Sequence, residues 1–454
     1  AMNYSDPRLN THSDEFENDY RDGYGHVYYK TATMLYNLEY VLGDTLFANA
    51  LIHYFNQWQF CHPYFEDFRS SIIRYTKVDL NWFFDQWLES QKRIDYAITR
   101  VRKSDVKGKY ILKFKRKGDM QMPLDFQVVD NNDSIHRFHI SNTWFSKKTD
   151  ATLLPKWTGF NHLNKTYEAE ITIPEGIKQV QIDPTNRLAD VNMLDNSSKS
   201  NVSIELDHQV YNRPDWRKYE FAARPDLWYN GFDGMKFGIH LNGGHFNTNH
   251  VFNFYLWANS GFGQWDVPEN VEKNQFMQMN FLFDYKTSLS RYWKNSEVNV
   301  AARILDGLYN YELGFSKQTR KKNTMFKLYF RSLYRQGDRD IAYLLNRDTW
   351  NANMWNNSFN LDVKHNYRYG SGNGELNIGL RTSALGSDYD YHQLKLEAKN
   401  STKLWRLMLK TRLFAQLGTG SNWAPESQLY LGGANPEQMM DNKFVRSSGI
   451  FPSS

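Results

Sequence analysis

The chain has 454 residues, enough for two to four domains at about 100–200 residues each. Its 55 Lys and Arg residues nearly balance its 50 Asp and Glu residues and are scattered along the chain, which argues against a nucleic-acid partner. Cys61 is the only cysteine, so an internal disulfide is excluded, and we expect this residue to be a small buried hydrophobe.

The apolar side chains of residues 28–88 recur with the period of a helix. The first apolar stripe consists of Leu35, Leu38 and Leu42. Gly43 follows as a predicted stop, because glycine readily adopts the positive φ that ends many helices, and Asp44 can begin the next helix. Helices this apolar must pack together. Residues 1–93 are therefore predicted to be an all-α bundle or part of one.

From about residue 94 the period of the apolar side chains changes to two. Short alternating segments such as KYILKFKRK and IKQVQIDP are separated by Gly, Pro, Asn and Asp, which favour turns. A run of about 100 residues with this pattern is typical of an immunoglobulin-like β-sandwich. We assign this domain to residues 94–200.

After Trp228 the alternating segments lengthen to about ten residues and become more aromatic. In one of them Met235, Phe237, Ile239 and Leu241 alternate with Lys236, Gly238, His240 and Asn242. Long strands with one apolar and one polar face are typical of an antiparallel transmembrane β-barrel. The pattern predicts a barrel over residues 201–454, with membrane lipid outside it and a polar lumen inside it.

A large soluble β-sandwich is the alternative for this last region. It predicts shorter strands and fewer charges on the inner face, because a packed core cannot hold unpaired charges. The charged residues that oppose it are Arg303, Lys364, Arg368 and Arg381. The predicted fold class is therefore multidomain α+β: a partial helical domain, a β-sandwich and an antiparallel transmembrane β-barrel.

None of the thirteen histidines begins an H-E-x-x-H motif, in which two histidines on one helix face bind zinc. The one histidine cluster, HLNGGHFNTNH from His240 to His250, falls on predicted strands or their loop. We therefore predict no metal site in this chain.

Two segments resemble a known family. VYYKTATMLYNLEYVLGDTLFANALIHYF and DLNWFFDQWL are similar to the C-terminal part of the catalytic domain of aminopeptidase N-type zinc metallopeptidases. IDPTNRLADVNMLDN is similar to the end of the β-sandwich that follows that domain in bacterial members. The resemblance implies a peptide substrate and a tyrosine that donates a hydrogen bond to the oxyanion of the tetrahedral intermediate.

The tyrosine that matches this role is Tyr28, and the resemblance leaves Tyr24, His26 and Tyr29 as lining of a substrate cleft or as packing. It also implies that zinc is bound only in the full-length parent, by residues upstream of this chain. We expect this chain to be cut within the catalytic domain and to be inactive alone.

The C-terminal stretch resembles a second family. LWRLMLKTRLFAQLGTG and ESQLYLGGANPEQMMDNKFVRSSGIFP are similar to the end of bacterial surface antigen barrels, the assembly-insertase superfamily of the outer membrane. In those barrels an arginine on an inward-folded loop seals against the barrel wall, and Arg446 is the nearest match. The resemblance implies that the barrel is incomplete at its C-terminus. Other outer-membrane proteins or lipoproteins are the expected protein partners.

Together the strand pattern and the two resemblances imply a fragment of an outer-membrane-anchored zinc metallo-aminopeptidase that hydrolyses N-terminal peptide bonds. The alternative is an outer-membrane assembly or transport barrel that carries an inactive peptidase-like docking domain. An intact H-E-x-x-H motif with its distal Glu in the upstream sequence would favour the enzyme.

Overall fold

The computed structural model describes residues 8–11, 25–159, 163–207, 214–230, 234–246, 248–264, 279–290, 292–305, 307–319, 323–337, 348, 350–429 and 437. The chain forms two compact units. The first consists of Ser5–Val202 with Trp216–Lys218, and the second contains Ser203–Asp215 and Tyr219–Ser454, together with Ala1–Tyr4. The predicted division at residue 93 lies inside the first unit, and the three-domain organisation stays a prediction.

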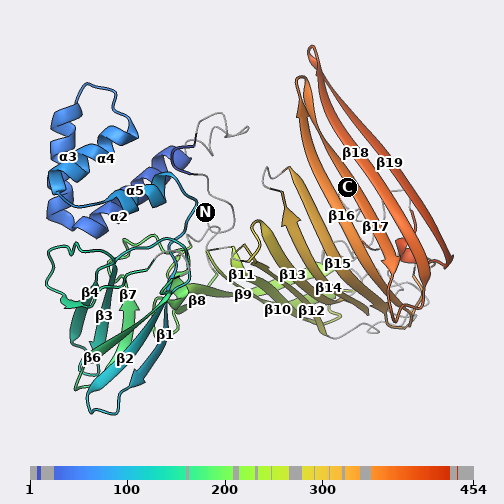
Figure 1. Cartoon of the computed structure of the whole chain (residues 1–454). Coiled ribbons are helices and arrows are strands. Elements are labelled where there is room, and N and C mark those ends of the chain that lie inside the picture. The colour runs from blue at the N-terminus through green and yellow to red at the C-terminus, as the bar shows by residue number, and fades with distance from the viewer. Residues whose placement is uncertain are drawn as a thin grey trace. The chain divides into compact units, whose positions relative to one another are not determined.

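The N-terminal part of the first unit is helical, as the period of residues 28–88 predicted. Its elements are the π-helical turn η2 (His26–Lys30) and the helices α2 (Thr31–Leu42), α3 (Asp44–Trp58), α4 (Phe65–Thr76) and α5 (Asn81–Leu88) (Figure 1). Gly43 separates α2 from α3 with φ +81°, which confirms the predicted stop. Cys61 is exposed in the connection between α3 and α4, beyond the end of either helix, so the expectation that it is buried is wrong.

The rest of the first unit is formed by two β-sheets. Their strands are β1 (Tyr96–Lys103), β2 (Lys109–Arg116), β3 (Leu124–Asp130), β4 (Ile135–Ile140), β5 (Thr152–Leu154), β6 (Thr166–Thr172) and β7 (Ile177–Ile182), and the 3₁₀ turn η3 (Met193–Asp195) follows. The strand orders are β1-β2-β6 and β5-β4-β3-β7, with only the β4–β5 pair parallel.

A single hydrophobic core joins the helices to the two sheets. Phe114 of β2 lies against Phe126 of β3, with ring centroids 4.8 Å apart, so the sheets face each other as a sandwich. Leu38 of α2 and Phe84 of α5 are fully buried in the same core. The helices are therefore held by the sandwich and are not an independent bundle.

The second unit is built around one twelve-stranded sheet. Its strands are β8 (Val202–Leu206), β9 (Tyr219–Asn230), β10 (Gly234–His245), β11 (Asn249–Asn259), β12 (Met279–Ser288), β13 (Ser296–Leu305), β14 (Leu308–Gln318), β15 (Thr324–Arg335), β16 (Trp355–Tyr369), β17 (Gly372–Ser383), β18 (Asp390–Leu404) and β19 (Leu407–Asn422), and the 3₁₀ turn η6 (Pro425–Ser427) follows. Each strand lies next to its neighbours in sequence, and the pairs from β9 to β19 are antiparallel. Among the described strands β8 and β19 are the two edges, so the sheet is open and the predicted closure into a barrel is not observed.

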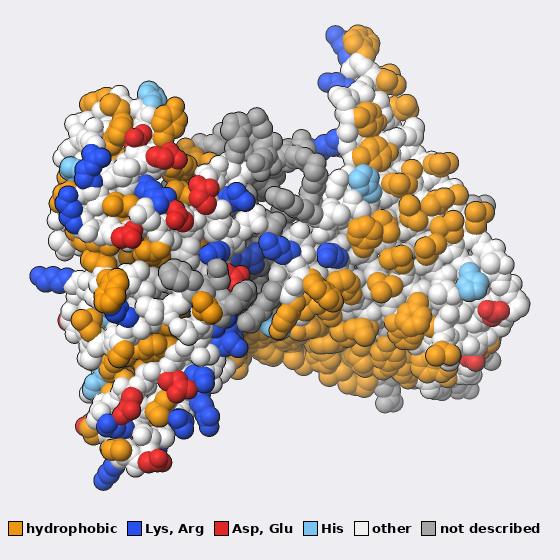
Figure 2. Space-filling model, in the orientation of Figure 1, with side chains coloured by type: hydrophobic (Ala, Val, Ile, Leu, Met, Phe, Trp, Pro, Cys, Tyr) orange, Lys and Arg blue, Asp and Glu red, His pale blue; other side chains and the backbone are white. Residues whose placement is uncertain are grey.

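The two faces of this sheet differ in a way that reverses the usual burial of a water-soluble sheet. Large apolar side chains are exposed on one face, with Leu313 at 58% and Leu328 at 54% of their full accessible surface. The polar side chains buried in the sheet include Lys236, His240, Asn280, Asn310, Arg331 and Asn360. Figure 2 shows hydrophobic side chains gathered over this unit. Large contiguous exposed apolar patches are uncommon on protein surfaces. None of the described helices is long and apolar enough to cross a membrane.

Charged residues on the polar face form ion pairs. Arg303 Nη2 lies 3.1 Å from Asp284 Oδ1, and Lys327 Nζ lies 2.6 Å from Glu312 Oε1. Pairing removes much of the cost of placing charges on a face that is partly buried.

Candidate functional site

Tyr28 lies in η2, the π-helical turn that leads directly into α2. Its side chain is 58% exposed, so the phenol is accessible from solvent. Single π-helical turns are rare and are found frequently at functional sites, because the extra residue changes the direction in which side chains project. The geometry therefore permits Tyr28 to contact a bound ligand.

The other predicted cleft residues are placed differently. His26 is buried, and its Nε2 lies 2.7 Å from the carbonyl oxygen of Arg8, so this imidazole packs inside the unit. Tyr29 is 77% exposed, and its carbonyl accepts a hydrogen bond from the hydroxyl of Thr33. Tyr24 and Arg446 lie outside the described residues. Cleft roles for these side chains stay predictions.

The helix that follows Tyr28 is fastened to the sandwich by polar contacts. The last carbonyls of a helix lack intrahelical partners. Lys147 Nζ donates to one of them, the carbonyl of Tyr40, at 2.8 Å and lies 4.3 Å above the Tyr40 ring. Earlier in α2, Asn37 Oδ1 accepts a hydrogen bond from the backbone N–H of Ala189 at 3.2 Å. These contacts fix α2, and with it the turn that carries Tyr28.

Asp125 lies at the centre of the junction between α2 and the sandwich. Its carboxylate accepts hydrogen bonds from His139 Nδ1 and Lys147 Nζ, each at 2.6 Å. Burial raises the pKa of Asp125, but the contacts with His139 and Lys147 outweigh it and hold the pKa below its usual value. The backbone N–H of Asp125 donates to Tyr40 Oη at 2.7 Å. Burial, and then the nearby charge of Asp125, raise the pKa of Tyr40 well above its usual value, so its phenol stays neutral.

Three side chains at the same junction lie in the order of a Ser–His–Asp triad. Ser141 Oγ lies 3.1 Å from His139 Nε2, and His139 Nδ1 contacts Asp125. Ser141 is only 3% exposed and its hydroxyl also bonds to that of Ser146, so a substrate carbonyl cannot reach it. We interpret the arrangement as structural. The sequence alone does not predict this arrangement, because nothing in the neighbouring residues distinguishes its three members.

No group of three or more His, Cys, Asp or Glu side chains that could hold a metal ion occurs among the described residues. In the histidine cluster, the ring of His240 is stacked on that of Tyr255 with centroids 3.9 Å apart. His250 Nδ1 lies 2.8 Å from Tyr285 Oη. Both imidazoles are thus engaged in contacts within the sheet.

Residues 5–87 match the Peptidase family M1 domain. The matched stretch contains Tyr28 and extends to the last turn of α5. It includes neither sheet of the sandwich and none of the twelve-stranded sheet. No curated protein matches the chain.

Members of the M1 peptidase family are typically zinc aminopeptidases. The residues of this chain do not fit their metal site. The histidines in the matched stretch are His12, His26, His53 and His62, and none begins an H-E-x-x-H motif. The donor set that the metal requires is therefore not supplied by this chain.

Proposed function

We propose that residues 5–87 are the C-terminal part of an aminopeptidase catalytic domain, with Tyr28 as a donor to the substrate. The observation that carries the proposal is the exposed phenol of Tyr28 on a π-helical turn, inside the stretch that matches the M1 peptidase domain. The reaction is hydrolysis of an N-terminal peptide bond. Zinc is expected only in the full-length protein, held by residues outside this chain.

In this proposal Tyr28 acts on the oxyanion that forms when the peptide carbonyl becomes tetrahedral. A neutral phenol suits the role because its hydrogen bond strengthens as negative charge develops, and it does not attract the ground-state carbonyl as strongly. The contacts of α2 with the sandwich keep the donor in place, which is necessary because such a donor must be positioned before the reaction.

We further propose that the twelve-stranded sheet contacts lipid of a bacterial outer membrane. The support is the exposed row of apolar side chains on one face and the paired charges on the other, which is the sidedness of outer-membrane strands. Lipid is then the partner of the apolar face. Other outer-membrane proteins or lipoproteins remain the proposed protein partners, and closure into a barrel is part of the same proposal.

The test of the peptidase proposal is Tyr28→Phe in the full-length protein, with an aminoacyl arylamide as substrate. Because the donor acts on charge that appears in the transition state, we expect kcat to fall by about 10²–10³-fold with little change in KM. Tyr29→Phe is the matched control and should leave kcat unchanged. An unchanged kcat in Tyr28→Phe, or a loss in Tyr29→Phe instead, would contradict the assignment.

The docking alternative is favoured by one observation, the absence of an H-E-x-x-H motif from this chain. If the full-length protein also lacks the motif and hydrolyses no arylamide, the peptidase-like region is a docking module carried by the unit that contains the twelve-stranded sheet.

A further inference from the structure

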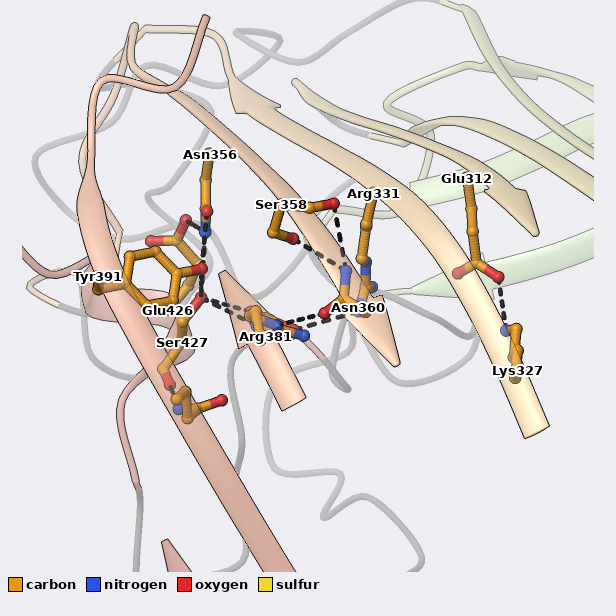
Figure 3. A network of polar contacts seen from close by, with 12 residues as sticks. Glu312, Lys327, Arg331, Asn356, Ser358, Asn360, Arg381, Tyr391, Glu426 and Ser427 are labelled. Atoms are coloured by element: carbon orange, nitrogen blue, oxygen red, sulfur yellow. Dashed lines mark hydrogen bonds and ion pairs between the residues drawn. The ribbon is translucent and has the colours of Figure 1, made fainter. Parts of the chain in front are cut away.

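The polar face of the twelve-stranded sheet holds one carboxylate between two arginines. Arg381 approaches Glu437 in a bidentate manner, with Nη1 2.6 Å from Oε1 and Nη2 3.1 Å from Oε2. Arg331 Nη1 lies 3.1 Å from Oε2, and the hydroxyl of Ser427 donates to Oε1 at 2.6 Å. Figure 3 shows Arg331, Arg381 and Ser427 converging in this network. The carboxylate thus receives four hydrogen bonds.

The cluster of Glu437, Arg331 and Arg381 is buried. Glu437 is 6% exposed and Arg331 is 8% exposed, and the side chain of Arg381 is 14% exposed. Bidentate pairs between guanidinium and carboxylate groups are among the strongest polar contacts in proteins. Breaking such a buried pair leaves an uncompensated charge, so the two arginines require an anion at this position.

The backbone positions of the two arginines are set by the sheet. Arg331 is in β15 and Arg381 is in β17, on either side of β16. In the strand register, Arg331 lies opposite Ser358 and Arg381 lies opposite Asn360, both in β16. Asn360 Oδ1 also accepts a hydrogen bond from Arg381 Nε at 2.6 Å, which orients the guanidinium. The sheet therefore places the two guanidinium groups where one carboxylate can contact both.

A polar cavity of about 200 Å³ adjoins the two arginines. The other side chains that line it include Tyr329, Asp362, Gln393, Lys395 and Gln416. The cavity therefore has room for atoms beyond the carboxylate itself.

We propose that Arg331 and Arg381 form a carboxylate-binding site on the polar face of the sheet. The site takes the side chain of an acidic residue, and its occupant in this structure is the chain's own Glu437. The assignment rests on ion pairs within the second unit and does not depend on peptidase activity or on lipid contact.

The test is chemical rescue of the full chain carrying Glu437→Ala. The unfolding temperature should fall by several degrees, because the two buried arginines lose their counter-charge. Acetate at tens of millimolar should restore part of the loss, and chloride at equal ionic strength should restore much less. If the alanine variant does not fold, Glu437→Gln keeps the size of the side chain but removes its charge, and it should also lower the unfolding temperature while showing no recovery in acetate, because the amide fills the site.

Two further variants make the result specific. Glu375→Ala removes a carboxylate that faces Lys364 on the same polar face, and it should show no recovery specific to acetate, because a lysine offers no bidentate geometry. Adding Arg381→Met to Glu437→Ala should abolish the acetate effect. An unchanged unfolding temperature in Glu437→Ala, equal effects of acetate and chloride, or rescue that persists without Arg381 would each overturn the proposal.

Discussion

Lys147 connects two parts of the first unit, because one ammonium group contacts the Asp125 carboxylate and the last turn of α2. Its side chain is 11% exposed and that of Asp125 is 21% exposed, so the pair is largely shielded from water. A contact of this kind contributes mainly by avoiding an unpaired buried charge. The contact of Lys147 therefore contributes more to holding α2 in place than two ordinary hydrogen bonds would.

We expect Lys147→Met to lower the free energy of unfolding by about 3 kcal/mol, because Asp125 and the Tyr40 carbonyl both lose a donor. Denaturant titration followed by circular dichroism measures the change. Lys148→Met is the matched control. The side chain of Lys148 is exposed, so its replacement should hardly change the free energy of unfolding. Equal effects of the two variants would contradict the role given to Lys147.

The lowered pKa of Asp125 predicts a pH dependence. A carboxyl group whose folded pKa is lowered contributes stability above its unfolded pKa of about 3.9, and this contribution is lost as the pH falls through the folded pKa. Unfolding titrations should therefore show that the wild type loses stability below about pH 4. Asp125→Asn should be less stable at neutral pH and should have a shallower loss in acid. Parallel acid profiles for the two proteins would contradict the prediction.

At the scale of elements, the boundary between α2 and α3 depends on one glycine. Gly43 has φ +81° and ψ 155°, a conformation that is almost restricted to glycine. A Cβ at this position would lie 3.7 Å from Lys147 Cβ, an ordinary contact, so a larger residue is excluded by its backbone and not by space. The chain can therefore begin α3 immediately after α2.

Gly43→Ala should lower the free energy of unfolding by about 1–3 kcal/mol through backbone strain alone. Thermal or denaturant unfolding measures this loss. Gly370→Ala provides the comparison, because a Cβ there meets no atom within 4 Å and its φ is outside the strained range. A neutral effect of Gly43→Ala would show that the connection relaxes to another conformation.

At the scale of the whole molecule, the twelve-stranded sheet places apolar rows where a water-soluble protein would place polar ones. Ile378 of β17 lies between Val363 of β16 and Leu396 of β18 in the strand register. Its neighbour Asn377 projects to the other face, where its amide is 2.8 Å from Glu375 and 3.4 Å from Glu397. Ile378 and Asn377 are thus adjacent in one strand but lie on opposite faces of the sheet, one apolar and one polar.

Ile378→Lys should reduce recovery of the protein in the membrane fraction, because a lysine on a lipid-facing strand costs about 2–4 kcal/mol near the bilayer centre. Asn377→Lys should be tolerated, since the new ammonium would lie beside two carboxylates. Membrane fractionation and heat-modifiable gel mobility compare the two variants. If both behave alike, or if the wild type is a soluble monomer without detergent, the lipid-facing assignment is wrong.

The order of the helical and alternating regions, the stop at Gly43 and the sidedness of the long strands could be predicted from the sequence alone. These features follow from local periodicity and from the backbone preference of one residue, so neighbouring residues suffice to predict them. Tyr28 was predicted from a contiguous motif, and the structure places it on an exposed π-helical turn, while its role stays a prediction.

The contacts that hold the candidate sites could not be predicted from the sequence. Lys147 meets Tyr40 across 107 residues, and Glu437 meets Arg331 across 106. Such pairs cannot be recognised from neighbouring residues. A lysine or an acidic residue is expected to be a solvated charge unless its distant partner is known. Burial and register, which arise only when strands and helices pack together, convert these ordinary residues into the junction of the first unit and the carboxylate site of the second.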